Sequence, residues 1–167
     1  MRSALLAFIL ALFSTSAAGH ATHQHGVAKL EVTIAGTELK LRLDTPLDNL
    51  LGFEHAPRTA AQRAAAQRLL ERLRQGDELF QPTLAAGCRM QRVEITAPVL
   101  QGAASVKDHA DLQAEWHFAC AELKRLTGLR VNLFADFPRL KRLDAAVAGP
   151  HGQSSKRLTT RMPDLAW

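Results

Sequence analysis

Two runs of alternating apolar and polar residues constrain the fold of this chain more than any other feature of its sequence. Residues 28–34 carry Ala, Leu, Val or Ile at every second position, and residues 39–44 carry leucine at every second position, with charged or polar residues between them. This period of two is typical of a β-strand that is buried on one face. A short turn that contains Gly36 separates the runs. The sequence therefore predicts an antiparallel hairpin with one apolar face.

One main helix is predicted after this hairpin. Thr59 and Gln62 have the spacing of a capping box, and the Ala-rich segment that follows ends before Gly76. Its apolar positions fall on one helical face: Ala66, Leu69, Leu70 and Leu73. A helix with a single apolar stripe can lie across one face of a sheet.

The remaining apolar runs predict further strands at residues 93–95, 114–120 and 129–133, with a weaker one at 143–147. Strands separated by turns, with one intervening helix, indicate an α+β fold: a single domain with a largely antiparallel β-sheet and one main α-helix packed on it. The chain of 167 residues shows no repeat and no second compositional block. We expect one domain over residues 27–167. Residues 97–107, with Pro98 and several small residues, predict an exposed loop.

Residues 1–18 are predicted to be a secretory signal peptide. Arg2 supplies a positive start, residues 4–13 are apolar, and residues 14–18 are small. The apolar run is too short to span a membrane, and no other segment resembles a membrane helix. Cleavage after Ala18 fits the small-residue rule, and cleavage after residue 17 or 21 is also permitted. We therefore expect an exported, soluble protein.

The charge of the chain is modest. Its formal net charge is +5, and loss of Arg2 with the leader leaves 20 basic and 16 acidic residues, hence +4. Several arginines lie on the predicted helix: Arg63, Arg68, Arg72 and Arg74. A solvated helix face explains them better than a nucleic-acid footprint, so no nucleic-acid partner is expected.

The chain contains two cysteines, Cys88 and Cys120. An even pair in an exported chain usually forms a disulfide, and the absence of Cys-x-x-Cys spacing disfavours a metal-binding or catalytic thiol pair. The bridge would close a loop of about thirty residues and stabilise the fold by on the order of 3 kcal/mol.

Histidines gather where the mature chain begins, in residues 19–26. His23 and His25 are two positions apart, so in an extended segment both rings project to the same side and one metal ion could take both. Neutral imidazole suits zinc, copper or nickel, and a zinc site needs about four ligands from several segments. His20 is a third imidazole of this cluster. The alternative is a solvated terminus without fixed ligand geometry.

Three other residues are candidate ligands. His55 precedes the predicted helix, and the hairpin can return its loop to the side of His23 and His25. His109 and Asp111 enter the strand at residues 114–120, on the face opposite the core. Each also has an ordinary structural interpretation, as a hydrogen-bonded loop histidine or as part of a polar strand face.

The sequence contains no catalytic pattern. It lacks a nucleophile elbow, a phosphate-binding Gly-rich loop and a His-Glu-x-x-His helix, and its cysteines are predicted to be bridged. We therefore expect a protein that is not an enzyme.

Segments spread over nearly the whole mature sequence are similar to those of one known family: residues 25–28, 46–57, 76–80, 86–88, 109–112, 118–120, 133–134 and 137–138. Among them, the string Gly-Phe-Glu-His-Ala-Pro is fairly specific. On these residues the chain resembles the ZrgA-type periplasmic zinc-binding proteins.

This resemblance implies a periplasmic metal-binding accessory protein that contributes to zinc acquisition or homeostasis, and it favours His23, His25, His55 and His109 as ligands. Members of the family often carry a long insertion rich in His, Asp and Glu between the cysteine-bearing segments. Residues 97–107 are short here and contain no histidine. A site for a few zinc ions is therefore expected rather than high-capacity storage.

Three functions remain open at this point. The first is zinc capture, with transfer to a metal transporter or metallochaperone of the envelope. The second is copper binding, because cleavage after residue 17 would give an Ala18-Gly19-His20 terminus that suits Cu²⁺. The third is an envelope interaction domain whose exposed strand edge binds a partner, without a role for metal.

Overall fold

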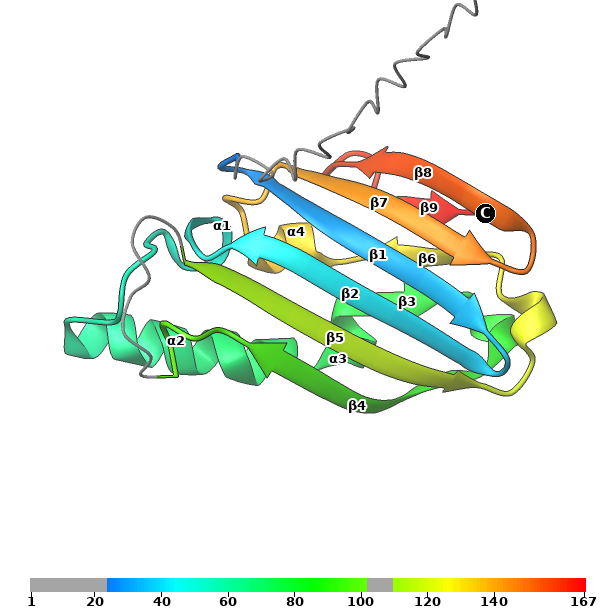
Figure 1. Ribbon diagram of the computed structural model, residues 1–167, viewed down its shortest axis with the longest axis horizontal. Coiled ribbons are helices and arrows are strands. Elements are labelled where there is room, and N and C mark those ends of the chain that lie inside the picture. Colours follow the sequence, from blue (N-terminus) through cyan, green and yellow to red (C-terminus); the bar gives the residue numbers. More distant parts are fainter. Residues whose placement is uncertain (1–23, 102–109) are drawn as a thin grey trace, which may run out of the picture.

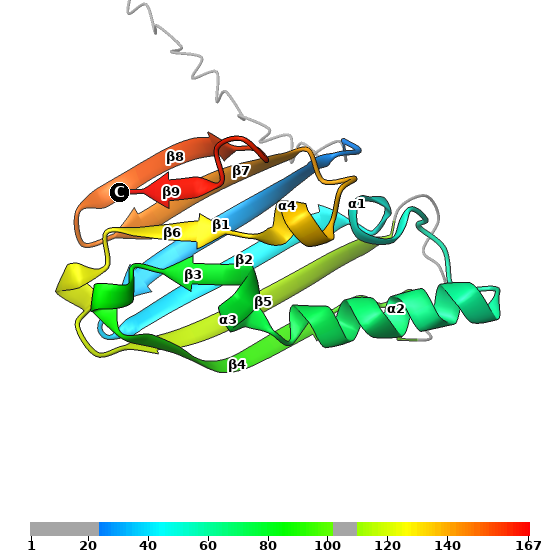
Figure 2. The ribbon, with the colours of Figure 1, turned by 180° about the vertical axis from the view of Figure 1, so that it is seen from behind.

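The fold consists of a large β-sheet with a second layer on one of its faces (Figures 1 and 2). The computed structural model of the chain describes residues 24–101 and 110–167. The large sheet has six strands in the order β4 (Cys88–Thr96), β5 (Asp111–Cys120), β2 (Glu38–Pro46), β1 (Val27–Ala35), β7 (Arg142–Gly149) and β8 (Gly152–Leu158). Neighbouring strands are antiparallel except for β1 and β7, which are parallel.

The second layer contains the helices and a small sheet, which Figure 2 shows on the near side. The small sheet has three strands in the order β3 (Phe80–Pro82), β6 (Gly128–Val131) and β9 (Asp164–Ala166). The helices are α1 (Asp48–Leu51), α2 (Ala60–Leu73), α3 (Gly76–Leu79) and α4 (Leu133–Asp136), with 3₁₀ turns η1 (Leu84–Ala86) and η2 (Leu123–Arg125). The opposite face of the large sheet is open in Figure 1. The predicted α+β class, with a largely antiparallel sheet and one main helix, is confirmed.

The predicted hairpin forms β1 and β2. Leu30 pairs with Leu43, and Val32 pairs with Leu41, so the apolar residues of both strands share one face. These leucines and Val32 are almost completely buried. Gly36 adopts a positive φ of 61° in the turn, a conformation that glycine reaches without steric cost. Local alternation therefore determined both the strands and their buried face.

The predicted capping box is present at the start of α2. The Thr59 side chain accepts a hydrogen bond from the Gln62 amide at 3.1 Å, and the Gln62 side chain accepts one from the Thr59 amide at 3.3 Å. The buried side of the helix consists of Ala66, Leu69 and Leu73. The Trp116 indole donates a hydrogen bond to the Leu73 carbonyl at 2.7 Å, which ties the end of α2 to the large sheet.

The predicted disulfide links β4 to β5. Cys88 and Cys120 are paired directly across these two strands and are bridged. Trp116, Phe118 and Cys120 are buried, as the alternation of β5 predicted.

The structure differs from the sequence predictions in several places, and the strand β8 (Gly152–Leu158) was not predicted. The predicted strand at 129–133 ends at Val131, and Leu133 begins α4. Of the exposed loop predicted at residues 97–107, the structure describes residues 97–101, and residues 102–107 lie outside the described part of the chain. Pro98 and Gln101 are exposed, but Ala97 and Val99 are buried, because apolar side chains after β4 reach the core. The small sheet was not predicted, since two of its strands have only three residues. No helix within the described residues is long and apolar enough to cross a membrane.

Candidate metal-binding site

The segments that carry the predicted ligands meet at one end of the large sheet. At this end β1 begins, β2 ends and β5 begins, because β2 runs antiparallel to both neighbours. Pro46 in β2 pairs with Asp111 in β5, and α1 and the loop of His55 follow β2. His25 lies in the turn that leads into β1. The topology therefore brings His25, His55 and Asp111 to the same end of the fold.

Asn49 fixes the entry of the chain into β1. Its side chain is fully buried, accepts a hydrogen bond from the Gly26 amide at 2.5 Å and donates to the Val27 carbonyl at 2.8 Å. It also donates to the Thr45 hydroxyl at 3.0 Å. Because α1 is thus bonded to the residues just after His25, the position of His25 is set by the fold.

The Asp48 carboxylate contacts the imidazole of His25 and holds the ring in place. His25 Nδ1 lies 3.0 Å from Asp48 Oδ2. Arg139 Nη2 donates to both carboxylate oxygens of Asp48 at 2.9 Å, and Arg139 Nε donates to the Asp48 carbonyl at 3.0 Å. The carboxylate is largely buried, whereas 62% of the His25 side chain is exposed. Asp48 is therefore a buried, charge-paired support for an exposed imidazole.

The pKa of Asp48 is lowered by these contacts. Burial by itself raises the pKa of this carboxyl, but the hydrogen bonds from Arg139 and His25 together outweigh that effect. The carboxylate is consequently ionised at neutral pH and can only accept hydrogen bonds. His25 Nδ1 must then be the donor, which leaves Nε2 with the free lone pair in the neutral ring.

The free nitrogen of His25 faces a second carboxylate. His25 Nε2 lies 4.0 Å from Glu54 Oε1, and the Glu54 side chain is 20% exposed. Zinc binds nitrogen and oxygen ligands at about 2.0–2.2 Å, so two ligand atoms of a tetrahedral site stand roughly 3.3 Å apart. A small side-chain rotation would bring His25 and Glu54 to that spacing. A carboxylate that orients a metal-binding histidine, as Asp48 orients His25, is a common feature of zinc sites.

His55 lies one residue beyond Glu54. Its Nδ1 lies 2.9 Å from the Ala56 carbonyl, which can only accept, so His55 also leaves Nε2 free in the neutral ring. The imidazole stacks on Phe53 with the ring centroids 5.1 Å apart. Gly52, with a positive φ of 80°, ends α1 and turns the chain into this loop.

Asp111 lies at the same end of the sheet but beside a different set of side chains. It lines a cavity of about 400 Å³ on the open face of the sheet, which Gln24 also lines. The other charged side chains around this cavity are Lys29, Glu31, Asp44, Arg142 and Asp144. Asp111 is therefore next to the segment of His25 but is not part of the group formed by His25, Asp48 and Glu54.

His20, His23 and His109 lie outside the described residues. Two residues that follow them in sequence are described: Gln24 follows His23, and Ala110 follows His109. The Ala110 carbonyl accepts a hydrogen bond from the Leu47 amide at 2.9 Å. Within residues 24–101 and 110–167, no three His, Cys, Asp or Glu side chains gather closely enough to hold a metal ion. His25 and Glu54 thus form a pair of candidate ligands rather than a complete site.

His117 forms a separate polar cluster on the open face of the sheet. Its Nδ1 lies 2.6 Å from Glu38 Oε1, its Nε2 lies 2.7 Å from Glu115 Oε1, and the ring is almost fully buried. The hydrogen bond with His117 is the largest effect on the pKa of Glu38, which is lowered. Arg92 also contacts the ring. Since a carboxylate engages each ring nitrogen, His117 offers no free lone pair to a metal ion.

The sequence was also compared with models of known protein families. Residues 22–167 match the model described as ZrgA family zinc uptake protein. The chain belongs to the ZrgA family. This match confirms the resemblance seen in the sequence and associates the chain with zinc. No curated protein matches the sequence.

Sequence reasoning alone missed the residues that support His25 in this ZrgA-family chain. Asp48 and Asn49 are adjacent polar residues between Leu47 and Leu50, and this placement was the available signal in the sequence. The structure buries both side chains in α1. Arg139 gave no local signal, since it lies 91 residues from Asp48 in the sequence. Glu54 precedes His55 in the Gly-Phe-Glu-His-Ala-Pro string but was not predicted as a ligand.

Proposed function

We propose that this chain is a non-catalytic, periplasmic zinc-binding protein that captures zinc for uptake or homeostasis. The observation that carries the proposal is the arrangement of His25, whose Nδ1 donates to the buried Asp48 while its Nε2 faces Glu54 at 4.0 Å. Membership of the ZrgA family supports zinc as the ion.

In this proposal, His25 and Glu54 supply two ligands and neighbouring segments supply the others. His23 precedes His25 by two residues, and His55 follows Glu54 directly, so both can complete the usual number of about four ligands. His20, His109 and Asp111 are the further candidates. Asp48 and Arg139 keep the His25 ring in the tautomer that presents Nε2 to the ion.

The exposure of the proposed site suits a protein that binds and releases its ion. Most of the His25 side chain is in contact with solvent, in contrast to the buried ligands of structural zinc sites. An exposed site at the end of a rigid sheet is also accessible to a metal transporter or metallochaperone of the envelope. We infer a site for a few ions, because residues 97–107 contain no histidine.

The proposal is tested by calorimetric titration of the tag-free mature protein with zinc at neutral pH. Saturable binding is expected, and His25→Ala should weaken it by about tenfold or more. Asp48→Asn should weaken it by about 10–100-fold, since such supporting carboxylates typically contribute that much to metal affinity. His151→Ala is the matched control, because His151 is exposed in the turn between β7 and β8.

Absence of both heat and retained metal would refute zinc binding. Equal effects of His25→Ala and His151→Ala would refute the assignment of the site to this end of the sheet.

A further inference from the structure

The large sheet has two outer strands, and only one of them has a regular free edge. The pairing of β4 with β5 shifts register between Met90 and Arg92, and such a bulge disturbs the ladder of an edge strand. β8 pairs with β7 without any shift, from Gly149 opposite Gly152 to Leu143 opposite Leu158. In the described part of the chain no strand pairs with the other edge of β8. This edge therefore presents a row of main-chain N–H and C=O groups.

β8 contributes almost nothing to the core. Residues 152–157 are exposed, and only Leu158 is buried. Ordering a strand costs conformational entropy, which most strands offset by burying one face. β8 is held mainly by its main-chain pairing with β7, and on its inner side Lys156 contacts the Asp164 carbonyl at the start of β9.

The edge of β8 is basic. Between Asp144 and Asp164 the chain has no acidic residue, and its charged side chains there are Lys156, Arg157 and Arg161. Arg157 is 67% exposed and lies 3.6 Å from Asp144, while Lys156 donates to the Asp164 carbonyl at 3.0 Å. Basic side chains on an edge repel a second basic strand and attract an acidic one. Pairing of two β8 edges would double this charge, which disfavours a second copy as the partner.

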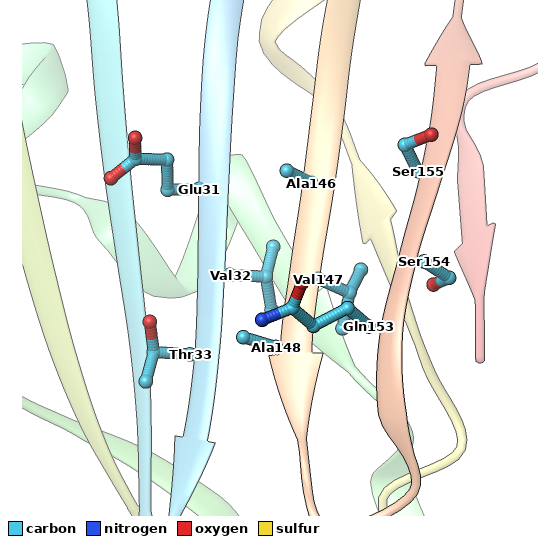
Figure 3. A pocket seen from close by; sticks show the side chains of 9 residues that line it. All are labelled: Glu31, Val32, Thr33, Ala146, Val147, Ala148, Gln153, Ser154 and Ser155. Carbon is cyan, nitrogen blue, oxygen red and sulfur yellow. The ribbon is translucent and has the colours of Figure 1, made fainter. Parts of the chain in front are cut away.

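The sheet is hollowed on both sides next to β8. On the open face, Ala146, Ala148 and Ser155 leave a depression of about 530 Å³, which Figure 3 shows bordered by Glu31 and Gln153. On the inner face, a cleft of about 1180 Å³ lies beside the β7–β8 turn. Its apolar lining comes mainly from Ile34, Leu123, Leu126, Val147, Pro150 and Trp167. Both hollows lie beside β8, over β7 on the open face and next to the β7–β8 turn on the inner face.

We propose that the edge of β8 binds an extended acidic segment of a partner protein, which joins the large sheet as an additional strand. Main-chain hydrogen bonds to the free edge would provide affinity, as in other cases of strand addition. Carboxylates of the partner would pair with Lys156 and Arg157. Long apolar side chains on its inward face would reach the cleft at Trp167.

This surface is independent of the proposed zinc site. The cleft is lined by Gly36 and by residues 149–152, where β1 ends and β7 turns into β8. His25 precedes the opposite end of β1. Loss of partner binding should therefore leave zinc binding unchanged, so the two proposals can fail separately.

The test uses three synthetic eight-residue peptides and the full mature protein labelled with ¹⁵N. The first peptide alternates Val and Glu, the second alternates Val and Lys, and the third is the Val/Glu peptide with alternate amides N-methylated. We expect the Val/Glu peptide to bind saturably, to slow hydrogen exchange of β8 amides and to change the fluorescence of Trp167. The Val/Lys and N-methylated peptides should bind about tenfold more weakly or worse, a difference of about 1.4 kcal/mol.

Variants of the protein complete the test. The double variant K156Q/R157Q should bind the Val/Glu peptide about fivefold or more weakly than the parent protein does. Arg68→Gln, on the exposed face of α2, should leave the affinity for this peptide unchanged. Zinc titration of both variants should match the parent protein.

Equal binding of the Val/Glu and Val/Lys peptides would overturn the acidic preference. Equal binding of the methylated peptide, or exchange protection confined to residues outside β8, would overturn strand addition. Dimerisation of the free protein through β8, seen by sedimentation, would overturn the choice of partner.

Discussion

Replacing Asn49 by alanine should destabilise this protein more than any comparable change of a polar side chain at its surface. The substitution removes three hydrogen bonds, to the Gly26 amide, the Val27 carbonyl and the Thr45 hydroxyl. Each contributes about 1 kcal/mol net, so the sum is about 3 kcal/mol. Asn49 is fully buried, and any partner left without a hydrogen bond adds a further cost.

A loss of about 3 kcal/mol is a large fraction of the stability of an ordinary domain, which is about 5–15 kcal/mol. For a domain of this size it corresponds to a fall in melting temperature of roughly 6–12 °C. Urea unfolding followed by the fluorescence of Trp116, which is fully buried, would measure it. Asn132→Ala is the matched control, because the Asn132 side chain donates one exposed hydrogen bond, to the Glu78 carbonyl at 2.8 Å. That variant should lose about 1 kcal/mol or less.

The same substitution should also weaken zinc binding, since Asn49 fixes the residues next to His25. Equal losses of stability in Asn49→Ala and Asn132→Ala would show that the buried amide does not hold the entry to β1. A destabilised Asn49→Ala protein with unchanged zinc affinity would show instead that the position of His25 does not matter for the ion.

Three further predictions follow from the structure. Thiol labelling of denatured, unreduced protein should find no free thiol at Cys88 or Cys120, and quantitative labelling of both would overturn the bridge. Replacing both cysteines by serine should lower the free energy of unfolding in urea by about 3–4 kcal/mol, as expected for a closed loop with a sequence separation of 32. Zinc affinity should fall steeply between about pH 7 and pH 5, since zinc needs neutral imidazole. His55→Ala should weaken zinc binding by a margin similar to that of His25→Ala, and unchanged affinity in His55→Ala would exclude His55 as a ligand. Because the pKa of Asp48 is lowered in the folded state, its contribution to stability is present above about pH 4 and is lost as the pH falls through the pKa of the folded state. Asp48→Asn should therefore reduce the loss of unfolding free energy that acidification causes, and an unchanged loss would contradict this.

The sequence by itself determined the features that depend on local periodicity. Alternation placed β1 and β2 and their buried faces, and it separated the core side of β5 from its polar side. The capping box located the start of α2, and the predicted export signal together with two cysteines predicted the bridge. These features could be predicted because each depends on residues close together in the chain or on composition. The motif around His55 likewise identified the family.

Only the tertiary structure decided which distant segments meet. β7 lies parallel to β1, although residues 27–35 and 142–149 are far apart in sequence. Arg139 reaches Asp48 across 91 residues, and Asn49 bonds to the turn that carries His25. No local pattern encodes such contacts, because they depend on the packing of the whole sheet and on the satisfaction of buried polar groups. The orientation of His25 toward Glu54 is therefore a property of the fold.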